Sequence, residues 1–123
     1  MKKLGITCII LCTSLVYATD YTLNITNNTR CTLENIISYD SLHSAPHTAA
    51  KAIASNTSGT IHVTEDYTIT LDRYNVRCAD NKVVDTIDIS IMVLADHVDL
   101  NYANTSNETT VQFVDNQLVL THN

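Results

Sequence analysis

Glycine and proline are scarce in this sequence, which contains two glycines and one proline in 123 residues. Gly5 lies in the apolar N-terminal segment, so Gly59 is the single glycine in the rest of the chain. A phosphate-binding loop needs several glycines close together, and the sequence excludes this kind of nucleotide site. Cys-x-x-Cys spacing is absent, which argues against a structural zinc site. Met92 is the one methionine beyond the N-terminal segment, which argues against a copper site.

Positive charge is also scarce. Seven Lys and Arg residues stand against thirteen Asp and Glu, and Lys2 and Lys3 belong to an N-terminal targeting segment. Without that segment the net charge is 5 − 13 = −8. A chain with this charge repels phosphate backbones and anionic lipid headgroups, so we predict no nucleic-acid partner.

The N-terminal segment has the pattern of a secretory signal. Lys2 and Lys3 precede the thirteen-residue apolar run Leu4–Val16, and Ala18 provides a small residue at the cleavage position. The run is shorter than the about 20 residues that a membrane span needs, so we predict no membrane anchor. We therefore expect residues 1–18 to be removed after Ala18, and residues 19–123 to form one secreted or periplasmic domain.

Two cysteines remain after this cleavage. Cys31 and Cys78 can form one intramolecular pair, and in an exported domain an even number of cysteines indicates a disulfide. We predict this bridge.

The rest of the chain favours strands. Threonine, valine, isoleucine and tyrosine are common, and apolar residues alternate with polar ones. In residues 111–120, a two-residue turn at Asp115–Asn116 would place Phe113 opposite Leu118 and Val111 opposite Leu120. In residues 60–71, a three-residue turn would pair Val63 with Tyr67 and Ile61 with Ile69, leaving His62, Thr68 and Thr70 on the solvent face.

Seven or eight short strands in one domain predict an all-β fold, an antiparallel β-sandwich. The alanine-rich stretch around residues 46–54 is the exception, and a short helix is slightly favoured there over a strand. The sequence predicts that Gly59 belongs to a turn.

Four residues come nearest to a metal-binding pattern: His43, His47, His97 and Asp99. His43 and His47 have the spacing of two ligands on one helix face, but Pro46 disfavours a helix through both. We predict a connecting loop with solvated histidines, and neither a metal site nor a cofactor.

Catalytic patterns are few. His97 and Asp99 would share a strand face and could orient an imidazole, as in a small hydrolase, although a solvated face is the commoner meaning of this pattern. Five Asn-x-Ser/Thr sequons start at Asn24, Asn27, Asn56, Asn104 and Asn107. They mark glycan acceptors only in a eukaryotic secretory protein, and a chain rich in these residues also produces them by composition.

We therefore predict a non-enzymatic binding protein whose partner is another protein, for example a cationic one, or a glycan. Three alternatives remain: a host-directed effector or toxin of the same architecture, a periplasmic metal-binding protein, and a small hydrolase that uses His97 and Asp99.

Overall fold

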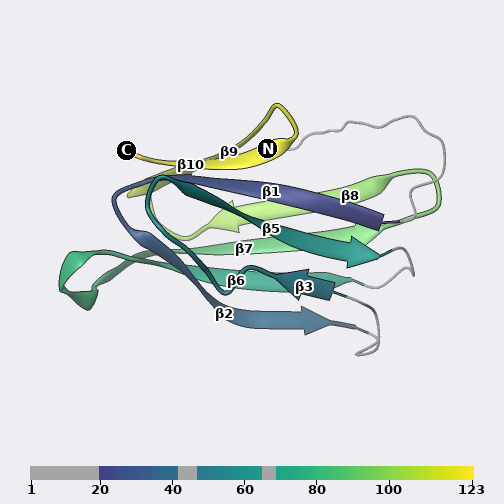
Figure 1. The fold of residues 1–123 in the computed structure, drawn as a ribbon, viewed down its shortest axis with the longest axis horizontal. Coiled ribbons are helices and arrows are strands. Elements are labelled where there is room, and N and C mark those ends of the chain that lie inside the picture. Colours follow the sequence, from purple (N-terminus) through teal and green to yellow (C-terminus); the bar gives the residue numbers. More distant parts are fainter. Residues whose placement is uncertain (1–19, 42–46, 65–68) are drawn as a thin grey trace.

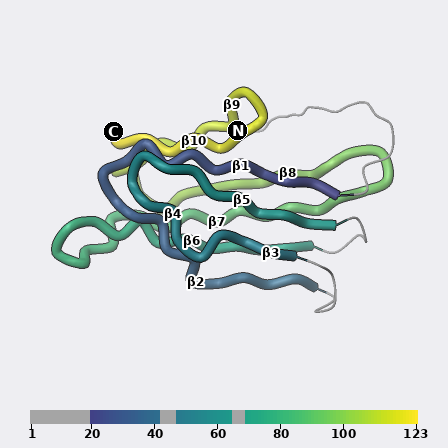
Figure 2. The backbone as a smooth tube through the Cα atoms, in the orientation of Figure 1, coloured from purple at the N-terminus to yellow at the C-terminus, as the bar shows by residue number. Residues whose placement is uncertain are grey.

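The computed structural model describes residues 20–41, 47–64 and 69–123. These residues form two five-stranded sheets that share one apolar core (Figures 1 and 2). Sheet A has the order β3-β5-β1-β10-β9, with β1 (Asp20–Asn28), β3 (His47–Ala49), β5 (Thr57–Thr64), β9 (Thr109–Val114) and β10 (Gln117–His122). Sheet B has the order β4-β2-β6-β7-β8, with β2 (Thr32–Asp40), β4 (Ala52–Ile53), β6 (Thr70–Arg77), β7 (Val83–Val93) and β8 (Val98–Asn104). A 3-10 turn, η2 (Ala79–Asn81), joins β6 to β7. The predicted β-sandwich is confirmed.

The core follows from the alternation in the sequence. On each strand every second side chain points between the sheets, as the two-residue period of a strand requires. The fully buried apolar side chains come from both sheets and include Leu23, Ile25, Leu33, Ile61, Tyr74, Ile87, Ile89, Ile91, Leu118 and Leu120. All strand pairs are antiparallel except β1 with β10, which run parallel with Ile25 opposite Leu118.

The C-terminal hairpin has the predicted register. Phe113 lies opposite Leu118 and Val111 lies opposite Leu120. Asp115 and Asn116 have φ values of 51° and 67°, the positive values that a two-residue hairpin turn requires. The alternation of apolar residues and the turn residues Asp115 and Asn116 together determine the register of this hairpin.

The predicted hairpin in residues 60–71 is wrong. β5 lies in sheet A between β1 and β3, whereas β6 lies in sheet B between β2 and β7. Ile61 pairs with Leu23 and Ala49 rather than with Ile69, and Thr70 is buried instead of facing solvent. An alternating pattern indicates which side of a strand is apolar, but not which strand lies beside it.

The predicted helix around residues 46–54 is also wrong. This stretch forms two short edge strands, β3 in sheet A and β4 in sheet B. Pairing with β5 and β2 outweighs the helical preference of alanine here. Gly59 lies inside β5 rather than in a turn, and a Cβ atom there would come within 2.7 Å of Ile53 Cγ1.

The disulfide between Cys31 and Cys78 is present, with a Cα–Cα distance of 4.3 Å. It joins the residue before β2 to the residue after β6, next to the paired residues Thr32 and Arg77. Such a bridge is compatible with an oxidising compartment. Within the described ranges no helix is long and apolar enough to cross a membrane. The predicted signal peptide (residues 1–18) lies outside these ranges.

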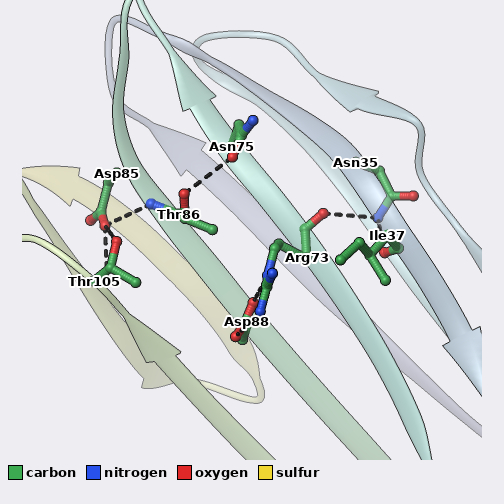
Figure 3. A network of polar contacts seen from close by, with 8 residues as sticks. All are labelled: Asn35, Ile37, Arg73, Asn75, Asp85, Thr86, Asp88 and Thr105. Carbon is green, nitrogen blue, oxygen red and sulfur yellow. Dashed lines mark hydrogen bonds and ion pairs between the residues drawn. The ribbon is translucent and has the colours of Figure 1, made fainter.

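Asp85 fixes the connection between β8 and β9. It is buried, and its Oδ1 accepts hydrogen bonds from the backbone N–H groups of Thr86 (2.8 Å), Thr105 (3.0 Å) and Ser106 (2.9 Å). Its Oδ2 accepts from Asn104 Nδ2 (2.9 Å) and from the Thr109 hydroxyl. Figure 3 shows the contacts with Thr86 and Thr105. Burial alone raises the pKa of Asp85, but these hydrogen bonds outweigh it and the pKa is lowered.

We expect Asp85 to make the fold sensitive to acid. A carboxylate whose pKa is lowered in the folded state stabilises the protein above its unfolded-state pKa, and this contribution is lost as the pH falls through the folded-state pKa. Melting temperatures measured from neutral pH into strong acid should therefore fall less steeply for Asp85→Asn than for the wild type. Asp115→Asn, in the exposed hairpin turn, is the matched control. Parallel melting curves for Asp85→Asn and the wild type would contradict the assignment.

Candidate functional site

The outer face of sheet B carries an apolar patch at one end. Tyr39 lies opposite Leu71 on the neighbouring strand, and Ile69 is held to Ser41 by two hydrogen bonds, from Ser41 N to Ile69 O (3.0 Å) and from Ile69 N to Ser41 Oγ (3.1 Å). Since Thr70 and Asp72 are buried, the alternation of β6 turns Ile69 and Leu71 to the outside, where Tyr39 joins them. We call Tyr39, Ile69 and Leu71 the outer patch.

The outer patch is conspicuous among the exposed apolar residues. Five large apolar side chains are exposed in the described residues: Ile36 (48%), Tyr39 (46%), Ile69 (51%), Val83 and Val114. Two of the five, Tyr39 and Ile69, therefore belong to the outer patch, whereas Ile36 lies at the β-bulge of β2, beside the Ile37–Arg73 pair.

The other end of the same face is charged but internally neutralised. Arg73 donates from Nε to Asp88 Oδ1 (2.6 Å) and from Nη2 to Asp88 Oδ2 (3.0 Å), as Figure 3 shows. The hydrogen bond and the charge of Asp88 raise the pKa of Arg73. Arg77 Nε donates to Glu34 Oε1 at 2.9 Å. The face thus divides into ion-paired rows and the apolar outer patch beside them.

His97 and Asp99 lie together on the surface, as predicted, but with a third residue. His97 Nδ1 is 2.7 Å from Asp96 Oδ1, and His97 Nε2 is 3.3 Å from Asp99 Oδ1. The hydrogen bond with Asp96 is the main cause that raises the pKa of His97, and the charge of Asp99 adds to it. Both ring nitrogens face carboxylates, so this ring offers no free nitrogen to a nucleophile.

His47 is not a solvated loop residue, and this prediction is wrong. Its side chain is 3% exposed and reaches from β3 in sheet A to sheet B, where Nε2 lies 2.8 Å from Asp72 Oδ2. Nδ1 lies 3.9 Å from Asp40 Oδ2. Asp72 is fully buried, and within the described ranges neither Asp72 Oδ1 nor Asp40 Oδ1 has a hydrogen-bond partner. The imidazole is therefore the main polar partner of a carboxylate in the core.

A third histidine contact lies on the outer face of sheet A. Thr22 Oγ1 and His62 Nδ1 are 2.7 Å apart across the β1–β5 pair, and His62 Nε2 is 3.7 Å from Asp20 Oδ2. The order hydroxyl, imidazole, carboxylate resembles a nucleophile with its base. The backbone N–H groups of β1 and β5 are, however, engaged in the strand ladders of sheet A, so these groups are not available to a developing oxyanion.

Sequence reasoning missed the cluster of Asp40, His47 and Asp72. The alternation of residues 70–77 could have indicated that Asp72 is buried, because it places Asp72 between the inward-facing Thr70 and Tyr74. His43 lies outside the described residues, so the expectation that it is a solvated loop residue stays a prediction. In the part of the chain that the structure describes, no three His, Cys, Asp or Glu residues are arranged to hold a metal ion.

The sequons fall into two structural classes. Asn27 Nδ2 donates to the backbone carbonyls of Cys31 (2.8 Å) and Ile53 (2.9 Å), and Asn104 Nδ2 donates to Asp85 Oδ2 and to two backbone carbonyls. Both amides are engaged in these hydrogen bonds, so a glycan on either one would have to break them. Asn24, Asn56 and Asn107 are exposed.

Comparison with known proteins adds no assignment: no family model matches the chain, and no curated protein or solved structure is significantly similar to it.

Proposed function

We propose that this chain is an exported protein-binding module without catalytic chemistry of its own, and that its partner docks on the outer patch. The exposure of Tyr39 and Ile69 together in the outer patch, at one end of sheet B, is the observation that carries this proposal. Exposed apolar side chains that cluster on a folded domain mark interaction sites far more often than scattered ones do. Tyrosine in particular is enriched among the residues that dominate binding energy.

The chemistry of the outer patch favours a protein over a glycan. Two of its three residues are aliphatic, whereas sugar rings are usually recognised by stacking on aromatic rings. The net charge of −8 expected without residues 1–18 would steer a partner whose contact surface is positively charged. The disulfide supports a site of action in an oxidising compartment, secreted or periplasmic, after removal of the signal peptide.

A photo-crosslinking amino acid at position 39 tests the proposal in cultures of the source cells. We expect one dominant crosslinked product from position 39 and none of the same mass from position 114, an exposed apolar position on sheet A. The substitution Ile69→Lys should abolish the product at position 39, because it places a charge in the middle of the apolar contact. Equal products from both positions, or a product that survives Ile69→Lys, would contradict docking on the outer patch.

A further inference from the structure

The outer edge of β2 is open over half of its length. β4 pairs only with Leu33 and Glu34, and Asn35 N donates to Lys51 O at 2.9 Å. The nearby β3 pairs with β5 and not with β2. From Ile36 to Asp40 no strand of the described ranges covers this edge, and Figure 1 shows β2 along the lower border of the molecule. An open edge of this kind is a template for pairing with another strand.

The ladder with β6 fixes which backbone groups of β2 face outward. Ser41 N donates to Ile69 O, so the backbone of Ser41 faces β6. Successive residues of an antiparallel pair face alternate sides, and the register from Ile37 to Asp40 is regular. Tyr39 therefore faces β6, whereas Ser38 and Asp40 present their N–H and C=O groups to the open edge.

This stretch is complementary to itself. If two copies pair antiparallel about a two-fold axis at Ser38, each Ser38 N–H meets the Ser38 carbonyl of the other copy. Ile37 then lies opposite Tyr39 of the second copy on the outer face, at a non-hydrogen-bonded position where cross-strand side chains are closest. Asp40, the one charged residue of the stretch, falls opposite Ile36, so no like charges face each other.

We propose that the chain forms a two-fold dimer through the β2 edge, which joins two copies of sheet B into one continuous sheet. The contact is a short strand pair, much smaller than a standard interface of roughly 1,600 Å², so the dimer is reversible and depends on concentration. The two outer patches then lie on the same face on either side of the axis. A dimeric partner could engage both at once and gain affinity from the link.

Sedimentation velocity of the mature protein, from low micromolar to near-millimolar concentration, tests the dimer. We expect the wild type to shift from monomer to dimer and Ser38→Lys to weaken the dimer at least tenfold, because two ammonium groups would then meet at the axis. Ser38→Pro should do the same, because it removes the outward N–H without touching the ladder with β6. Gln112→Lys, on the edge strand β9 of sheet A, is the matched control and should dimerise like the wild type.

Two results would overturn the dimer: a wild type that stays monomeric over the whole range, or a Ser38→Lys variant that melts like the wild type and dimerises equally well. Neither result concerns the docking of a partner on the outer patch. In the dimer Tyr39 lies opposite Ile37 of the second copy, so a crosslinked product from position 39 with the mass of two copies reports the dimer. A product of any other mass reports a partner on the outer patch, so the dimer and the proposed function can fail independently.

Discussion

Replacing both Cys31 and Cys78 with alanine is expected to lower the free energy of unfolding by about 4 kcal/mol. The bridge spans 47 positions of the sequence and restricts the unfolded chain, which is the main origin of the effect in the chain-entropy model. A domain of this size has only about 5–15 kcal/mol of total stability, so the loss is a large share. Urea unfolding of the double variant and of the wild type gives the difference directly.

The control for this experiment is the wild-type protein unfolded under reducing conditions. It retains both sulfur atoms, so any difference between it and the double variant measures the loss of packing around the buried Cys31 rather than the loss of the bridge. A destabilisation below about 1 kcal/mol in both samples would show that the unfolded chain is already restricted by other means.

The substitution His47→Ala is expected to cost about 3–5 kcal/mol, because it leaves the Asp72 carboxylate in the core without its imidazole partner. Asp72 is fully buried, so a carboxylate that loses its partner there carries a large desolvation cost. Beside Asp72, burial first and then the Asp72 charge raise the pKa of Tyr74, whose hydroxyl donates to Ala50 O at 2.7 Å. Chemical denaturation at neutral pH measures the cost.

Two further variants distinguish the effect of losing the His47–Asp72 contact from the effect of changing strand β3. Thr48→Ala changes an exposed residue of the same strand, β3, and should alter stability by no more than about 0.5 kcal/mol. The double substitution of His47 and Asp72 by leucine should recover most of the loss, since replacing both partners of a buried polar contact by apolar residues is often neutral. If His47→Ala were as mild as Thr48→Ala, the imidazole would not be what compensates Asp72.

Local patterns predicted the parts of the fold that depend on local chemistry. The Asp115–Asn116 turn and the apolar residues on either side of it determine the C-terminal hairpin, and the two cysteines beyond residue 18 allow a single bridge. The neighbours of β5 and β6 were not predictable in this way. Whether a strand joins sheet A or sheet B depends on contacts across the core, and such contacts produce no periodic pattern in the sequence.

The candidate site was predictable only in part. The pairing of His97 with Asp99 followed from strand alternation. The buried position of His47 did not, because it depends on Asp72, which lies 25 positions away, and on an edge strand that propensity does not favour. The outer patch also needed the structure, since Tyr39 and Ile69 belong to segments whose adjacency no local pattern reports.

The parallel contact between β1 and β10 has a consequence for the timing of folding. Its partners are far apart along the chain, as for Ile25 and Leu118, where 118 − 25 = 93. During synthesis β1 lacks the neighbour on one side until β10 has left the ribosome, so sheet A cannot close early. Topologies of this kind fold slowly, in milliseconds to seconds. A polypeptide whose first strand waits for its last one stays open for most of its synthesis, which is the state that the proposed export through a translocation channel requires.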